Sequence, residues 1–390
     1  MAMEEVPSQG SGHAASEGSE KAARLSSRRP LGVLEPEAAH GPAAAPASHR
    51  PGPSWVLEDF RAQPTDLEGT VLGGRYRIVG FVGSGATADV YLAEDLEAGA
   101  FVVVKRLTET ATRDPEISGC FLREATAAQS IEHPNVVRLL AVQRPPDDRP
   151  FLVIEALAGE SLGDYLRRES SVPQKLGLTL CRQIAVGLSA AHRSGVVHRD
   201  VKPDNLFLFG APGAPDGLKI LDFGMAKVDS LGTGTTDLVM GTVHYMAPEQ
   251  IVLDPVDGRT DVYALGVVMF RMFTGQLPFD TMPGTELLGH QLFSPAPPPS
   301  WLNEELDPRV EAIMLRAMRK HPDNRYPNMD YLLADLEAVL GLHPGRAAEV
   351  DLPPLEREPD VYVPRNDQGR KAAEVIAQRF GSARVAASGE

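Results

Sequence analysis

One short polar segment of this sequence combines residue types that could do chemistry together. It covers residues 198–205, with the sequence HRDVKPDN, and apolar residues flank it on both sides. Asp200 could accept the proton of a hydroxyl group, Lys202 could neutralise a phosphoryl group, and Asn205 could coordinate Mg²⁺. Transfer of a phosphoryl group to an alcohol requires these side chains. We therefore predict a polar loop with that chemistry, held between two short apolar elements.

Four further segments accompany this loop, two before it and two after it. They are the glycine-rich stretch 83–90 (GSGATADV), the apolar run 102–105 (VVVK), and the triplets 222–224 (DFG) and 247–249 (APE). One short motif could arise by chance, whereas the whole set in this order is highly specific. The sequence therefore resembles the protein kinase superfamily, and most closely the eukaryotic-like serine/threonine kinases of bacteria, over residues 76–342.

The elements that must position these segments show two kinds of pattern. From Tyr76 onwards, β-branched and aromatic residues are separated by glycines, which indicates strands and turns. Beyond residue 158 the apolar residues follow helical spacing. The resemblance implies an α+β, bilobal kinase fold. Residues 76–157 would form a small antiparallel β-sheet with one helix, and residues 158–342 a larger, mainly helical lobe.

The function of the glycine-rich stretch depends on the resemblance, because glycines mark many ordinary strand turns. The resemblance implies that its backbone approaches the phosphates of ATP and that backbone groups around Glu155 and Leu157 bind the adenine. Ala88 replaces the family's third glycine, and we expect its methyl group to tighten the turn with a modest effect. The residues expected to contact ATP are Val82, Gly83, Ser84, Gly85, Ala86, Thr87, Ala88, Asp89, Val90, Val103, Lys105, Glu155 and Leu157.

Lys105 ends an apolar run that starts at Phe101. A lysine in that position either extends its charged end to solvent or meets a buried anion. The resemblance implies the second state, in which Lys105 holds the α- and β-phosphates of ATP. It also implies that Lys105 pairs with Glu124, on a helix predicted over residues 117–131. An ordinary surface ion pair is the alternative.

The resemblance also implies functions for the polar loop. Asp200 would orient the acceptor hydroxyl and take its proton, and Lys202 would stabilise charge on the group in transfer. Asn205 and Asp222 would coordinate Mg²⁺ or Mn²⁺, because hard cations prefer oxygen ligands. Lys202 together with Thr242 indicates serine and threonine hydroxyls as acceptors.

The segment after Asp222 contains several hydroxyl side chains among glycines. By resemblance, Arg199 is the cation that binds a phosphorylated activation loop, and a phosphate brings about two negative charges. We therefore predict activation by autophosphorylation of this segment. The candidate acceptors are Thr233, Thr235 and Thr236.

Three charged residues are expected to have structural functions. Asp261 begins an apolar helical stretch, where a carboxylate is favourable at the N-terminus, and by resemblance it braces the catalytic loop. Arg325 is expected to pair with Glu249 and so to fix the end of the activation segment.

Composition excludes several other classes of protein. The net charge of −15 argues against attraction to nucleic acid or to anionic lipid, because both are negatively charged. The two cysteines, Cys120 and Cys181, match neither a metal site nor a disulfide framework, so we expect free thiols in a reducing compartment. We see no secretory signal and no membrane span, and predict a cytoplasmic location.

The two ends of the chain differ in composition from its centre. Residues 1–68 are rich in Ala, Pro and Gly, and we predict a disordered tail. In residues 343–390, Ala372, Val375, Ile376 and Phe380 lie at helical spacing, which is compatible with a short docking helix. A disordered C-terminal tail is the state that the composition favours. Either tail could bind a partner.

These features predict a serine/threonine protein kinase that phosphorylates proteins and itself. The alternative is a scaffold that keeps the kinase fold and binds partners without turnover. Such a scaffold would be expected to lack Lys105, Asp200 or Asp222, and all three are present. A small-molecule kinase is disfavoured, because residues 241–242 and 247–249 match the segments with which the family docks a polypeptide.

Overall fold

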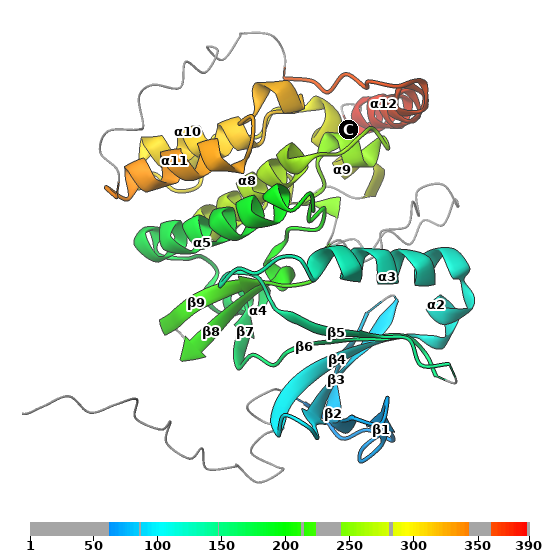
Figure 1. Ribbon diagram of the computed structural model, residues 1–390. Coiled ribbons are helices and arrows are strands. Elements are labelled where there is room, and N and C mark those ends of the chain that lie inside the picture. The colour runs from blue at the N-terminus through cyan, green and yellow to red at the C-terminus, as the bar shows by residue number, and fades with distance from the viewer. Residues whose placement is uncertain are drawn as a thin grey trace, which may run out of the picture. The chain divides into compact units, whose positions relative to one another are not determined.

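The chain forms a lobe built on a β-sheet, followed by a lobe built mainly of helices (Figure 1). The computed structural model describes residues 62–85, 87–146, 148–211, 214–223, 243–280, 284–342 and 360–387. The α+β, two-lobe architecture predicted from the sequence is confirmed.

The first lobe is a six-stranded antiparallel sheet with the order β1-β2-β3-β4-β6-β5. On β4, Val102 and Val104 are buried on one face, as the two-residue period of a strand requires. Helix α3 packs through Phe121 and Ala125 into a cluster with Leu107 of β4. The elements are β1 (Val71–Leu72), β2 (Tyr76–Ser84), β3 (Ala88–Asp95), β4 (Ala100–Leu107), α2 (Glu109–Arg113), α3 (Pro115–Ala128), β5 (Leu139–Gln143) and β6 (Phe151–Glu155).

This lobe begins earlier than predicted. Gln63 forms an antiparallel bridge with Phe81, and each backbone N–H donates to the other residue's carbonyl at 2.6 Å. Leu72 of β1 is buried beside Tyr76. The predicted start at residue 76 and the predicted disorder up to residue 68 are therefore wrong for residues 62–75. These residues gain backbone pairing and apolar contacts that their own composition does not reveal.

The helix predicted over residues 117–131 is present as α3, which begins at Pro115 and ends at Ala128, and the short helix α2 precedes it. Asp114 has an extended backbone, with φ −91° and ψ 110°, and it separates α2 from α3. It precedes Pro115, and a residue before proline is disfavoured in the helical conformation. The proline then starts α3.

The second lobe is organised around α8, which is buried along most of its length. Asp257 caps the start of α8 by accepting a hydrogen bond from the backbone of Arg259, and Gly275, with φ 77°, ends it. A three-stranded sheet of order β7-β8-β9 faces the first lobe. The elements are β7 (Gly159–Ser161), α4 (Leu162–Glu169), α5 (Gln174–Arg193), β8 (Leu206–Ala211), β9 (Ala214–Ile220), α7 (Pro248–Ile251), α8 (Gly258–Thr274), α9 (Gly284–Phe293), α10 (Pro308–Ala317), α11 (Met329–Val339) and α12 (Asp367–Ala387), with the short 3₁₀ turns η1 (Pro203–Asn205), η3 (Pro299–Trp301) and η4 (Pro322–Asn324).

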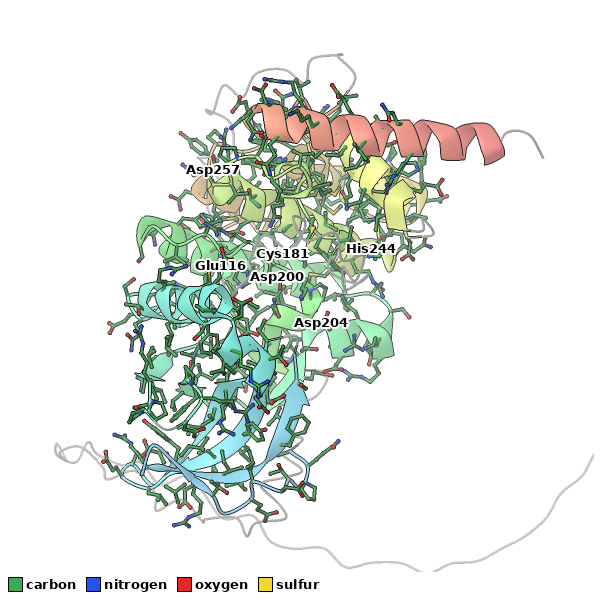
Figure 2. The ribbon with its side chains drawn as sticks, turned by 90° about the vertical axis from the view of Figure 1, so that its right-hand side faces the viewer. Glu116, Cys181, Asp200, Asp204, His244 and Asp257 are labelled. Carbon is green, nitrogen blue, oxygen red and sulfur yellow. The ribbon has the colours of Figure 1, made fainter. Side chains whose placement is uncertain are left out.

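The C-terminal segment 360–387 is folded against this lobe. Its helix α12 lies beside α9 in both views (Figures 1 and 2). Tyr362 and Phe380 are buried. The disordered tail that the composition favours is therefore wrong for these residues, because the surface that buries their aromatic side chains exists only in the folded lobe.

Two further findings concern membranes and thiols. Within the described ranges, no helix has both the length and the apolar character needed to cross a membrane. Both cysteines are free, and burial raises the pKa of the Cys181 thiol. The predicted cytoplasmic location stays a prediction.

Candidate active site

The glycine-rich stretch forms the turn between β2 and β3. The backbone N–H of Gly85 donates to the carbonyl of Ala88 at 2.8 Å, and Ser84 Oγ donates to Asp89 Oδ1 at 2.7 Å. A Cβ atom at Gly83 would meet no other atom within 4 Å, so a ligand could approach the backbone there. Ala86 lies outside the described residues.

The packing of Ala88 gives a physical reason for alanine at the position of the family's third glycine. Its methyl group is buried in the cluster that contains Leu107 of β4 and Phe121 of α3. The neighbouring Thr87 carbonyl accepts a hydrogen bond from the backbone of Thr108, the N-cap of α2, at 2.9 Å. The base of the turn is thus tied to both helices of the first lobe.

Lys105 lies on β4, where its strand neighbours are Val90 on β3 and Leu152 on β6. Its Nζ atom is 2.9 Å from Asp222 Oδ1, and its side chain is only 13% exposed. Lys105 therefore meets an anion instead of extending to solvent. The predicted partner Glu124 lies on α3, and because its side chain lies outside the described part of the chain, that ion pair stays a prediction.

The other residues expected near ATP line the same strands. Val82 is exposed, Val90 and Val103 are half-buried, and Val103 pairs with Ile154 of β6. Leu157 follows β6 and is half-buried. These positions place the predicted contacts around the turn and the end of β6.

Glu155, the last residue of β6, connects the two lobes through its side chain. Its Oε1 atom accepts hydrogen bonds from Lys219 Nζ of β9 at 2.6 Å and from the backbone of Arg138 at 2.8 Å. The carboxylate is thereby engaged in structure. Any contact of Glu155 with an adenine would accordingly use its backbone groups.

Asp261, in the first turn of α8, holds the polar loop through its completely buried carboxylate. Its Oδ2 and Oδ1 atoms accept hydrogen bonds from the backbone N–H groups of His198 and Arg199, each at 2.8 Å. His192 Nε2 of α5 lies 2.7 Å from Oδ2 as well. A buried carboxylate with several donors is a strong local constraint, so the loop is pinned at its start. No motif in the sequence indicated the contribution of His192.

Within the loop, Asp200 is held by two neighbours. Lys202 Nζ donates to Asp200 Oδ2 at 2.9 Å. Asn205 Nδ2 donates to the Asp200 carbonyl at 2.8 Å and to Oδ2 at 3.1 Å. The turn η1, which begins at Pro203, brings Asn205 back towards Asp200. Figure 2 labels Asp200 in the region where the two lobes meet.

Leu221 connects this loop with Asp222. Its N–H donates to the Asn205 carbonyl at 2.9 Å, and its own carbonyl lies 2.8 Å from His198 Nε2. Asp222 has φ 51° and Arg199 has φ 66°, a region that residues other than glycine seldom adopt. Such strain persists where surrounding contacts impose it, and it is concentrated at functional sites.

The oxygen atoms of Asn205 and Asp222 fit a divalent cation. Leu221 donates its N–H to the Asn205 carbonyl, and Asp222 is the next residue in the chain. Amide and carboxylate oxygens suit Mg²⁺. The described residues contain no group of three or more His, Cys, Asp or Glu that could hold a metal. Mg²⁺ takes one or two protein ligands and completes its shell with phosphate and water.

Glu249 of α7 and Arg325 form a completely buried ion pair, with N–O distances of 2.7 and 2.8 Å. Thr260 Oγ1 also donates to Glu249 at 2.8 Å. Burial by itself would raise the pKa of Glu249, but the Arg325 charge and these hydrogen bonds outweigh it and lower that pKa below its ordinary value. The next residue, Gln250, donates from Nε2 to the Arg199 carbonyl at 2.8 Å, a link to the catalytic loop that the sequence did not indicate.

The segment predicted to be phosphorylated lies outside the described residues. Arg199, its predicted partner, is described and has an exposed side chain. Residues 224–242 are outside the described part of the chain, and they include Gly224, Thr233, Thr235, Thr236 and Thr242.

A two-lobe fold with these contacts between its strand lysine, its polar loop and its buried ion pair defines the class of protein kinases. The model of the protein kinase domain family matches residues 76–332, so the chain belongs to this family. The solved PknI kinase domain of Mycobacterium tuberculosis agrees in fold, with a TM-score of 0.56 at 24% identity over 69% of this chain and 98% of that one.

Curated relatives are bacterial serine/threonine kinases. The chain is 33% identical to the serine/threonine-protein kinase Pkn1 of Myxococcus xanthus, over 90% of this chain and 54% of Pkn1. It is 34% identical to PrkC of Bacillus subtilis, over 70% of this chain and 42% of PrkC. The chain thus spans about half of the length of these relatives, or less.

Proposed function

We propose that this protein is a serine/threonine protein kinase that transfers the γ-phosphate of ATP to hydroxyl groups of proteins. The main support is the contact of Lys105 with Asp222, because it joins the two lobes at the residues that the family uses for ATP and for the metal. The names of the relatives support serine and threonine as acceptors.

The residues of the site have separate functions in the transfer. Asp200 accepts a hydrogen bond from the acceptor hydroxyl and takes its proton late, which suits a loose transition state. Lys202, 2.9 Å from Asp200, offsets negative charge at the same place. Asn205 and Asp222 hold Mg²⁺ or Mn²⁺, which supplies neutralisation of the phosphate charge when bound.

A phosphate-transfer assay with radioactive ATP on a generic protein substrate tests this function. We expect Asp200→Asn to lower kcat by about 10²- to 10⁴-fold. Asp204→Asn is the matched control, because this carboxylate belongs to the same loop but faces Arg167 at the surface, at 3.3 Å. It should stay within about 2-fold of the wild type, since surface pairs contribute little.

The transfer assay combined with calorimetry separates a kinase from a scaffold. Calorimetry with Mg²⁺ should show ATP binding by the wild type and by Asp200→Asn, and weaker binding by Lys105→Met. ATP binding without transfer, with either Mg²⁺ or Mn²⁺, would establish the scaffold instead. Absence of ATP binding would refute both the kinase and its nucleotide site.

Autophosphorylation is part of the proposal. Arg199 lies beside Asp200 with its side chain exposed, where it can pair with a phosphate on the activation segment. Mass spectrometry after incubation with ATP should find phosphate on Thr233, Thr235 or Thr236, and none in the Asp200→Asn protein. A fully active enzyme with an unmodified segment would contradict this step.

A further inference from the structure

The C-terminal segment 360–387 contacts the second lobe through two built attachment points. It has no regular secondary structure over residues 360–366 and continues as α12 beside α9 (Figure 1). None of the assigned functions uses this contact. Its position raises the question of what it does for the phosphorylation of a protein, and the answer below rests on the proposed function.

Asp254 is the first attachment point. This residue follows α7 and is buried. Among the described residues, all the donors to its carboxylate belong to the tail: Tyr362 Oη at 2.7 Å, Arg365 N at 2.7 Å and Asn366 N at 3.2 Å. A buried carboxylate is costly unless such donors compensate it. The loop after α7 is therefore built to receive residues 362–366.

Gly289, in the middle of α9, is the second attachment point. A Cβ atom there would overlap the ring of Phe380 from α12. His290 and Phe293 surround the same ring, with centroid distances of 5.0 and 6.3 Å. Glycine inside a helix costs about 1 kcal/mol relative to alanine, so its presence here fits the close packing of Phe380.

Helix α9 also supports the end of the activation segment. Leu287 packs with Val243, and Leu292 shares one apolar cluster with Met246 and with Tyr362 of the tail. Gln291 Nε2 donates to the His244 carbonyl at 2.7 Å. One helix thus contacts both the tail and residues 243–246.

We propose that residues 360–387 are a positioning element for the protein substrate. By packing on α9 and binding Asp254, the tail holds α9 and the loop after α7 in place, and α9 in turn supports residues 243–246. These residues lie between the 241–242 and 247–249 segments, which by resemblance to the family dock a polypeptide. The tail therefore raises affinity for the protein substrate without touching ATP.

Two variants from opposite sides of the contact test the proposal. Gly289→Ala and Phe380→Ala each disrupt the packing of α12 on α9, and alanine favours the α9 helix itself. Val375→Ala is the matched control, because Val375 lies on α12 with its side chain half exposed. Hydrogen exchange of the α12 amides shows whether each variant has released the helix.

Steady-state kinetics and exchange give the deciding measurements. We expect both variants to raise KM for a protein substrate about 2- to 30-fold, with KM for ATP and kcat within about 2-fold of the wild type. The double variant should add little, because both changes remove the same contact. The amides of residues 243–252 should exchange faster than in the wild type.

Three results would overturn the proposal. They are an unchanged KM for the protein substrate after release of α12, an equal rise in KM for ATP, and a lower KM for the protein, which would mean that the tail competes with the substrate. If the wild type transfers no phosphate, the proposed function fails. Exchange at residues 243–252 then still decides whether the tail holds this segment.

Discussion

The buried ion pair between Glu249 and Arg325 allows a prediction with a worked magnitude. In Arg325→Met, Glu249 stays buried without its cation. Three backbone carbonyls also lose a donor, those of Arg319 at 2.6 Å, Lys320 at 2.7 Å and Arg259 at 3.0 Å. Removing one partner of a buried pair costs about 3–5 kcal/mol. Typical total stabilities are about 5–15 kcal/mol, so the loss should be large.

The pH dependence of this loss has a definite sign. In the wild type the pKa of Glu249 is lowered, so its stabilisation is present above the unfolded pKa of 4.5 and is lost as pH falls through the folded value. In Arg325→Met, burial raises the pKa of Glu249 against only the hydrogen bonds from Thr260 and the backbone, because the opposing charge is gone. The carboxyl then becomes protonated in the folded state as pH falls from 7.5 to 5, so the difference in unfolding free energy should shrink.

Urea denaturation at pH 7.5 and pH 5 measures both effects. Arg309→Met is the matched control, because the Arg309–Asp307 pair is largely exposed and should contribute about 0–1 kcal/mol. A loss below about 1 kcal/mol in Arg325→Met, or a loss that is the same at both pH values, would refute the assignment of a buried, charge-compensated carboxylate.

Two other residues give separate predictions. Asp261→Asn should lower kcat about 10- to 100-fold and leave KM for ATP nearly unchanged, because it weakens charge-assisted hydrogen bonds to the backbone of His198 and Arg199. Steady-state kinetics measures both constants, and an unchanged kcat would contradict the bracing function. Lys320 is completely buried, and burial lowers its pKa to about 7, so the folded state binds fewer protons than the unfolded state above that value. The unfolding free energy of the wild type should therefore rise from pH 7 to pH 10 relative to that of Lys320→Met, and a flat difference in paired urea titrations would show that Lys320 is solvated.

The parts of the site that the sequence predicted are those with local signals. The loop 198–205 and the run that ends at Lys105 are contiguous, and each has a residue order that few other folds require. The strand and helix periods indicated strands from residue 76 and helices beyond residue 158, because each period depends on residues close in the chain. The two-lobe arrangement followed from the family resemblance. Chemistry encoded in neighbouring residues can be predicted without a structure.

Contacts between distant residues were beyond the sequence. Lys105 contacts Asp222, which lies 117 positions later in the chain. Gln250 of α7 donates a hydrogen bond to the Arg199 carbonyl in the polar loop. The start of the first lobe at residue 62 depends on pairing of Gln63 with Phe81, which no composition signal marks. Such contacts arise only when the whole sheet or lobe has formed.

The sequence by itself determined the class of chemistry and the order of the elements, because both depend on residue types within short stretches. The tertiary structure alone decided how the C-terminal segment behaves. Its composition favours disorder, yet Phe380 packs on Gly289 and Tyr362 donates to Asp254. The physical reason is that a partly apolar segment folds only where another part of the molecule offers a matching surface and buried acceptors, and these are assembled from residues more than 70 positions away.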